Sequence, residues 1–182
     1  DVMTHRHLAE MSPEVSEERK AVTAKHLKEI YRYAQAPLCR HKVLTEYFGQ
    51  SYEFADGSGR CGACDVCLNE TQELPAEESL LTAQKIISAV YRCGQTFGAG
   101  HVIDVLRGKS QEKVVRYGHD QLRVFGLMPE ADALKLRTWI DQLIMQDFLQ
   151  VDESSGFALL CGTDKGLALC KSGGRVRLSV VE

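Results

Sequence analysis

The chain has 182 residues, of which 44% are hydrophobic and 26% are charged, and its 22 basic and 25 acidic side chains give a formal net charge of -3. These fractions are those of a soluble globular protein with one ordinary domain or two small ones. No apolar run approaches the roughly 20 residues that a membrane span needs, and the negative net charge gives no global signal for nucleic acid. An argument for nucleic-acid binding must therefore rest on local charge.

The first part of the chain predicts a helical hairpin. Ser12-Pro13-Glu14 predicts a turn into a helix, with Ser12 as the cap and Pro13 at the first helical position. From Ser16 to about Ala36, apolar residues recur close to a 3.6-residue period, at Val22, Leu27, Ile30, Tyr31 and Ala34. After Pro37, a second helix is expected from Cys39 to about Phe48, with an apolar face made by Val43, Leu44, Tyr47 and Phe48. Two such helices are too small to fold on their own core and need a further constraint.

Four cysteines supply that constraint. Cys61, Cys64 and Cys67 lie in a CGACDVC run, and Cys39 returns from the second helix. Four thiolates can close a tetrahedral shell around Zn²⁺ with no open position for water, so the spacing predicts a structural zinc. An iron-sulfur cluster also uses C-x₂-C-x₂-C with a remote cysteine, although Leu68 stands where ferredoxin runs have proline. His41 is a possible substitute ligand, but we expect it to face solvent.

Disulfides are the other alternative for these cysteines. The chain has seven of them, an odd number, and shows no signal peptide. Free thiols beside a metal-type cluster favour a reducing compartment, meaning cytosol, nucleoid or nucleus. The chain also begins at Asp1 without an initiator methionine, and we expect it to be a piece of a longer protein.

The remainder predicts a second domain, after a polar linker LNETQELPAEES. Helices are expected over residues 79–93, 101–109, 111–117 and 130–148, with core faces that include Leu80, Leu81, Ile86, Ile87, Val102, Ile103, Leu134, Leu136 and Trp139. Two short strands, 148–151 and 157–160, joined by DESSG predict a hairpin. A helix capped by Thr163 and a closing strand over residues 175–181 follow. The fold class is mainly α with a small β wing, a zinc-stabilised helical hairpin followed by a winged-helix domain.

Basic charge gathers in one part of the second domain. From Lys85 to Arg123 the chain has seven basic and three acidic residues, a local balance of +4. Arg107, Lys109 and the Ser110 hydroxyl stand beside a helix start, which suits contact with DNA phosphates. Gly108-Lys109-Ser110 imitates a Walker A ending, but Ile103 occupies the position of the required glycine, so no ATP site is expected. His101 and His119 fit structural hydrogen bonds as well as functional roles, and no catalytic constellation stands out.

The chain resembles the zinc-binding and winged-helix region, called RecQ-C-terminal, of RecQ-family DNA helicases. CRHKVLTEYFGQ followed by CGACDVCL is similar to the zinc module of that family, and DVLRGKSQEKVVRYGHDQLRVFGL is similar to its winged-helix signature, in the same order. The resemblance implies that residues 1–14 are the tail of a helicase core, 15–72 a zinc-binding helical module and 73–182 a winged-helix DNA-binding domain. It also implies a parent enzyme that unwinds DNA in the 3′ to 5′ direction with ATP and Mg²⁺, which the missing helicase core would bind.

The resemblance also implies site residues. Cys39, Cys61, Cys64 and Cys67 fall on the zinc ligands, and the segment expected to contact DNA comprises Arg107, Lys109, Ser110, Lys113, Arg116, His119 and Arg123. The hairpin around Asp152 to Gly156 corresponds to the wing, which in some members separates strands. Here its tip is acidic and Phe157 is expected to pack inside, so we do not expect a wedge.

Two hypotheses follow for this piece, which itself should hydrolyse no ATP. In the first, it grips duplex, forked or tailed DNA beside the helicase core of the same chain, in the bacterial cytoplasm at the nucleoid, during unwinding, recombination and repair. In the second, it is a protein-docking module with a structural zinc and no direct role on DNA. A winged-helix fold does not decide between them.

Overall fold

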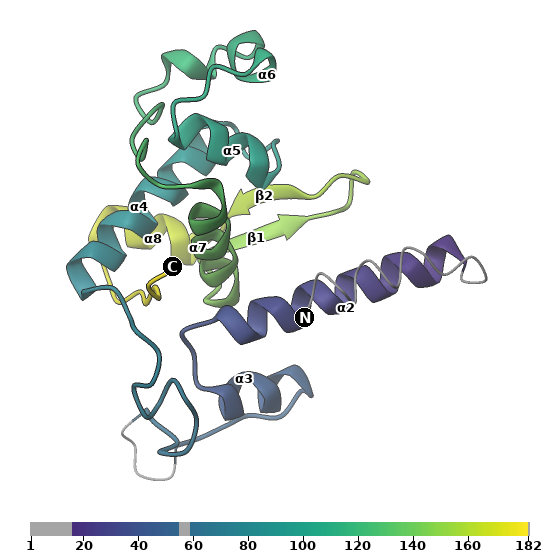
Figure 1. Cartoon of the computed structure of the whole chain (residues 1–182), viewed down its shortest axis with the longest axis vertical. Helices are drawn as coiled ribbons and strands as arrows, with labels where there is room; N and C mark the ends of the chain where they lie inside the picture. Colours follow the sequence, from purple (N-terminus) through teal and green to yellow (C-terminus); the bar gives the residue numbers. More distant parts are fainter. Residues whose placement is uncertain (1–15, 55–58, 182) are drawn as a thin grey trace.

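The computed structural model describes residues 16–54 and 59–181, which are mainly helical with one two-stranded hairpin in the part described (Figure 1). The expected helix start at Ser12 and Pro13 lies outside these residues. The helices are α2 (Glu17–Gln35), α3 (Arg40–Tyr47), α4 (Ala76–Arg92), α5 (Ala99–Leu106), α6 (Glu112–Arg116), the 3-10 helix η1 (His119–Gln121), α7 (Ala133–Met145) and α8 (Asp164–Ser172). The strands are β1 (Leu149–Asp152) and β2 (Leu159–Gly162).

The main core belongs to the second domain, as the apolar periodicity predicts. Helices α4, α5 and α7 pack together and against the hairpin and α8, and the fully buried side chains include Ile86, Ile87, Val90, Val105, Leu106, Leu136 and Leu143. Two expected core positions are wrong, because Leu81 is 53% exposed and Leu134 is 60% exposed. Leu134 is the second residue of α7, and Leu81 lies on the side of α4 opposite its buried face.

The hairpin is antiparallel, with Leu149 opposite Gly162 and Asp152 opposite Leu159. Its turn extends away from the helices in Figure 1 and is closed by a hydrogen bond from the Ser154 amide to Asp152 Oδ1 at 2.9 Å. Phe157 is 73% exposed, so the expectation that it packs inside is wrong. Strand β2 begins two residues later, which leaves Phe157 on the projecting turn, beyond the reach of the core.

The closing strand expected over residues 175–181 does not form. Among the residues that the structure describes, this segment pairs through one isolated bridge, between Glu73 and Ser179. Side chains from α7 take the place of a neighbouring strand, because Gln146 Oε1 accepts from the Arg177 amide at 3.1 Å and Gln142 Oε1 accepts from the Ser179 amide at 3.0 Å. The backbone amides of this segment are therefore hydrogen-bonded by side chains of a helix and not by a neighbouring strand.

Helix α8 depends on a glycine for its close approach to the hairpin. Thr163 caps the helix as expected, its hydroxyl accepting from the Gly166 amide at 3.0 Å. A Cβ at Gly166 would fall on the carbonyl oxygen of Phe148, which is backbone and cannot rotate away.

We therefore expect Gly166→Ala to destabilise the domain by about 1 to 3 kcal/mol, the usual range for overpacking, measured by thermal unfolding. Gly100→Ala is the matched control, because a Cβ at Gly100 would meet nothing within 4 Å. That control should be neutral or slightly stabilising. Equal unfolding temperatures for the two variants would contradict this account of α8.

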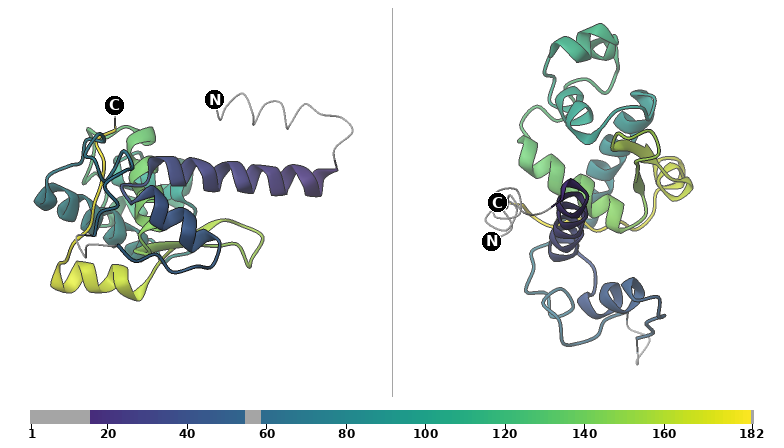
Figure 2. Two further views of the ribbon diagram at one scale, coloured as in Figure 1. Left: turned by 90° about the horizontal axis from the view of Figure 1, so that it is seen from below. Right: turned by 90° about the vertical axis from the view of Figure 1, so that its right-hand side faces the viewer.

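The helical hairpin differs from the expectation in what it buries. Ser16 caps α2, which extends beyond the rest of the described chain in Figure 2, and the C-terminal half of α2 packs on α7 of the second domain. The apolar face assigned to α2 is largely uncovered, with Val22 48% and Ile30 59% exposed, and no residue of α3 is buried. The two helices therefore do not form a core with each other.

Candidate metal centre and nucleic-acid interface

The four predicted cysteines converge on one point. Their sulfur atoms all lie within 4.8 Å of one another, with three of the four residues buried. Cys39 stands at the N-terminus of α3, and the CGACDVC run turns back on itself, with the Cys67 amide directed at Cys64 Sγ at 3.4 Å and the Cys61 amide at Cys67 Sγ at 3.4 Å. Such N–H groups stabilise thiolates. Four sulfurs at this spacing fit the tetrahedral shell of a structural zinc ion.

Zinc also fits the electrostatics of this cluster. The hydrogen bond to His41 lowers the pKa of Cys61 to about 5, whereas burial raises the pKa of Cys67 to about 12. Burial likewise raises the pKa of Cys39. Without a cation the thiols of Cys39 and Cys67 would stay protonated at neutral pH, so a bound metal ion is what allows these two sulfurs to ionise. The structure pairs none of the seven cysteines in a disulfide, and the convergence of four sulfurs on one point favours a metal site over the disulfide alternative.

His41 corrects one expectation. It is exposed, but it does not simply face solvent, because its Nδ1 lies 3.2 Å from Cys61 Sγ. Because four sulfurs already complete the shell, His41 is positioned to orient the Cys61 ligand through this contact and not to bind the metal itself.

An ion pair next to the cluster was not predicted. Arg40 Nη2 lies 2.9 Å from Asp65 Oδ2, and Arg40 Nη1 donates to the Ala36 carbonyl at 2.9 Å. The bond to Arg40 lowers the pKa of Asp65. These two residues immediately follow Cys39 and Cys64, so the pair ties the two halves of the metal site together. Their positions next to two predicted metal ligands were the feature of the sequence from which this ion pair could have been predicted.

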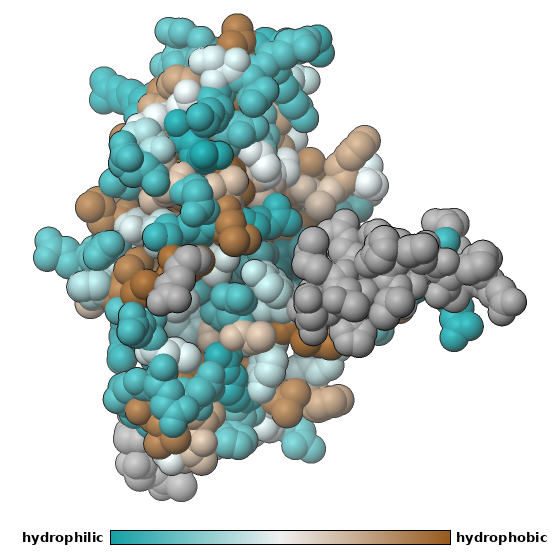
Figure 3. All heavy atoms as spheres, in the orientation of Figure 1, coloured by the Kyte–Doolittle hydropathy of each residue, from teal (hydrophilic) through white to brown (hydrophobic). Residues whose placement is uncertain are grey.

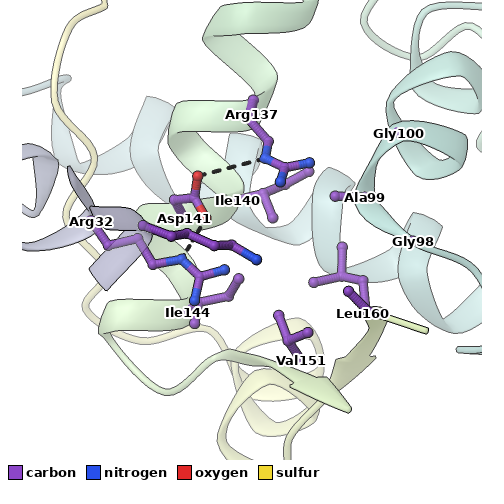
Figure 4. A pocket seen from close by; sticks show the side chains of 12 residues that line it. Arg32, Gly98, Ala99, Gly100, Arg137, Ile140, Asp141, Ile144, Val151 and Leu160 are labelled. Carbon is purple, nitrogen blue, oxygen red and sulfur yellow. Dashed lines mark hydrogen bonds and ion pairs between the residues drawn. The ribbon is translucent and has the colours of Figure 1, made fainter. Parts of the chain in front are cut away.

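A second ion pair joins α2 to the winged-helix domain (Figure 4). Arg32 Nε donates to Asp141 Oδ1 at 2.7 Å, and Arg137 lies 3.6 Å from the other carboxylate oxygen. Asp141 is 4% exposed. Beside them is a cavity of about 220 Å³ that reaches Val151 and Leu160 of the hairpin. Burial, followed by the charges of Arg32 and Arg137, lowers the pKa of Lys28 at its edge.

The basic segment forms the tip of the molecule that lies farthest from α3 (Figure 1), and the corresponding end of the surface is predominantly hydrophilic in Figure 3. Its exposed members are Lys109, Ser110, Lys113, Arg116 and Arg123. Arg116 pairs with Glu112 at 2.8 Å, and Lys113 Nζ lies 5.3 Å from the Phe97 ring centroid. The cations therefore share one end of the fold, on and around α6.

Two expected members of this segment are less accessible. Arg107 is half-buried, and its Nε atom is buried with no hydrogen-bond partner in the described part of the chain. The half-buried ring of His119 hydrogen-bonds to His101, with Nδ1 to Nε2 at 2.7 Å, which matches the structural reading of these histidines.

Two glycines, Gly108 and Gly126, lie against each other where the basic segment joins the core. A Cβ at Gly108, whose φ is +70°, would lie 3.1 Å from the Cα atom of Gly126. The Gly126 amide donates to the Val105 carbonyl at 2.9 Å, and the Met128 amide donates to Leu106 at 2.8 Å. Residues between the glycines thus leave and rejoin the core at one narrow point.

An apolar groove of about 610 Å³ runs between α2 and α3. Its lining includes Ile30, Tyr33, Val43, Leu44, Tyr47 and Met145. Leu44 is 48% and Tyr47 is 64% exposed. The groove contains most of the apolar face that α3 does not bury. None of the helices in the described ranges has the length and apolar content for crossing a bilayer.

Comparison with known proteins gives two family matches, a RecQ zinc-binding family over residues 1–68 and the RQC domain over residues 78–182. The ATP-dependent DNA helicase RecQ of Haemophilus influenzae is 36% identical over 124 residues, which cover 68% of this chain and 19% of that protein. The proteins of the same name from Pasteurella multocida and Bacillus subtilis are 34% and 28% identical over 72% and 94% of this chain, and over 20% and 27% of their own lengths. The chain thus spans about a fifth to a quarter of these relatives.

Proposed function

The chain belongs to the RecQ family, of which it carries the zinc-binding and RQC domains, and from this membership we propose that it grips duplex or junction DNA beside a helicase motor. The motor, with its ATP and Mg²⁺, would lie in another part of the same protein and unwind DNA in the 3′ to 5′ direction for recombination and repair. We propose residues 1–14 as the tail of that motor, 15–72 as the zinc module and 73–182 as the DNA-binding domain. The place of action would be the nucleoid in the bacterial cytoplasm.

The observation that carries this proposal is the exposed basic tip. Lys109, Lys113, Arg116 and Arg123 are exposed there in a chain whose net charge is -3. Cations on one projecting segment can follow a phosphate backbone without reading bases, so the preference would be for DNA structure over sequence. Arg107 and His119 would support the segment from beneath, and the Ser110 hydroxyl would add a neutral hydrogen bond to phosphate.

The apolar groove supports the motor as the partner of the zinc module. It presents apolar side chains that neither α2 nor α3 covers. Large exposed apolar surfaces mark protein interaction sites. We propose that the motor of the same protein packs against this groove, which would place the basic tip at the opposite end of the chain from the motor contact.

DNA binding is tested by fluorescence-anisotropy titration of the chain against a tailed duplex and a single strand at several salt concentrations. We expect duplex-bearing DNA to bind more tightly, with an affinity that falls steeply as salt rises. Lys109→Ala with Arg123→Ala should make the negative slope of log affinity against log salt shallower by up to about 2, because each lost phosphate contact removes about 0.9 from its magnitude. Both side chains are exposed, so the fold should persist.

The matched control is Lys171→Ala with Arg175→Ala, which removes the same charge from exposed positions on and after α8. Its salt slope should equal that of the unaltered chain. If the two double variants weaken binding equally, the charge of the whole chain accounts for the effect and the placement of the site fails. Absence of binding at low salt would favour the alternative, a protein-docking module whose basic tip is only solvated surface.

A further inference from the structure

A second group of metal-ligating side chains lies inside the winged-helix domain. Cys93 is the C-cap residue of α4, His101 lies on α5, and His119 begins η1. The sulfur and one nitrogen of each imidazole all lie within 4.8 Å of one another. Cys93 is 2% exposed and His101 is 9% exposed, so the group sits within the fold. None of these residues belongs to the four-cysteine cluster.

We propose that Cys93, His101 and His119 form a second transition-metal site, which binds Zn²⁺ with water as the fourth ligand. One thiolate and two imidazoles are a donor set that zinc takes in proteins with three protein ligands. Zn–S and Zn–N bonds of about 2.3 and 2.0 Å place tetrahedral ligand atoms roughly 3.3 to 3.6 Å apart. His101 and His119, at 2.7 Å, would separate by about half an ångström as their shared hydrogen bond is replaced by two bonds to the metal.

The surroundings hold the two rings in place for this role. The Phe97 ring stacks on His101, with centroids 4.1 Å apart and an interplanar angle of 19°. The same ring meets His119 edge-on at 4.9 Å. An aromatic wall of this kind restricts ring rotation, which lowers the entropic cost of ligation. The rings are therefore oriented before any metal binds.

The thiol of Cys93 also differs from the other two cysteines of the domain. Cys161 donates to the Gln95 carbonyl at 3.4 Å, and Cys170 lies 3.9 Å from the Ser88 hydroxyl. Within the described residues, no hydrogen bond is found for the Cys93 sulfur, which faces the two imidazoles instead. Cys93 belongs to the hydrophobic core, and within that core its sulfur is the atom that lies beside two imidazole nitrogens, which is the arrangement that a metal ligand needs.

Metal binding would have a structural consequence at the basic tip. Helix α5 contacts both α4 and the α6 segment, and it lies between them in Figure 1. A metal held by Cys93, His101 and His119 would cross-link η1, which follows α6, to the domain core. The inference concerns metal binding and does not depend on whether the tip contacts DNA.

The test is the number of zinc ions bound by the full chain, measured by inductively coupled plasma mass spectrometry after equilibration with micromolar free zinc and gel filtration. We expect two per unaltered chain and one for Cys93→Ala and for His119→Gln. Cys170→Ala is the matched control and should retain two. Fluorescence of the single tryptophan, Trp139, which is 6% exposed, reports whether each variant is folded.

Cobalt substitution identifies the ligands independently. The second equivalent of Co²⁺ should add a thiolate charge-transfer band in the unaltered chain and none in Cys93→Ala. His119 is only half-buried, so His119→Gln keeps the test valid if Cys93→Ala fails to fold. One zinc ion per unaltered chain, or a second ion that persists in both folded variants, would overturn the proposal.

Discussion

Cys64→Ser is expected to remove the zinc ion of the four-cysteine cluster and to unfold the zinc module, while the winged-helix core stays folded. Among the described residues, the buried core of the module consists of Cys39, Cys64, Val66 and Cys67, with Phe54 and Cys61 packed against it. Structural zinc contributes about 10 to 16 kcal/mol of apparent binding free energy in small modules. So few buried side chains cannot replace that contribution, whereas the winged-helix domain has a separate and much larger core.

The measurement combines zinc content with hydrogen exchange. Amides of α3 and the CGACDVC run should lose protection in Cys64→Ser, and amides of α4 and α7 should keep it. Cys170→Ser, which alters a half-buried cysteine outside the cluster, should retain both zinc and protection. A Cys64→Ser chain without the cluster zinc but with a protected α3 would show that packing alone holds this module.

Arg32→Ala is expected to release α2 from the winged-helix domain and to lower stability by about 3 kcal/mol, the lower end of the range for breaking a buried ion pair. The change leaves Asp141 buried, with Arg137 at 3.6 Å as its remaining ion-pair partner. The cost arises because the buried carboxylate loses its short contact and is left with the longer one from Arg137, so Arg32→Ala combined with Asp141→Ala should recover part of the stability. Hydrogen exchange along α2 and urea unfolding measure the two effects.

Arg137→Ala provides the control in the same cluster (Figure 4). Its side chain is 45% exposed, and a surface pair of that kind contributes about 1 kcal/mol or less. If Arg137→Ala destabilised the chain as much as Arg32→Ala, the attachment of α2 to the winged-helix domain would depend on the total charge around Asp141 and not on the short contact from Arg32. If Arg32→Ala alone and Arg32→Ala with Asp141→Ala lowered stability equally, the buried Asp141 carboxylate would not be the cause of the loss.

The elements that local sequence determines were predicted well. The CGACDVC spacing found the metal site because short spacing limits where the sulfurs can point, and the 3.6-residue period found the core helices α4, α5 and α7. Thr163 was identified as a cap because a threonine followed by a helical pattern has few other roles. The resemblance to the RecQ family was also correct.

The features that failed depend on contacts distant in sequence. The strand expected at 175–181 was wrong because the glutamines that satisfy Arg177 and Ser179 lie 31 and 37 residues earlier, at the C-terminal cap of α7 and on α7 itself. Phe157 was misplaced because burial depends on where β2 begins, which alternation alone does not fix. The group of Cys93, His101 and His119 has wide and irregular spacing, so only the fold brings its three side chains together.

The bridge between Glu73 and Ser179 holds the two ends of the winged-helix domain next to each other. The Leu74 amide donates to the Leu178 carbonyl at 2.8 Å, and the Val180 amide donates to Gln72 at 2.9 Å, so the chain enters and leaves the domain side by side. A unit whose two ends meet can be spliced into a surface loop of another protein without stretching either partner. We therefore expect residues 72–180 to be insertable as one unit into an unrelated scaffold, which would have to cover the face of α7 that α2 occupies here.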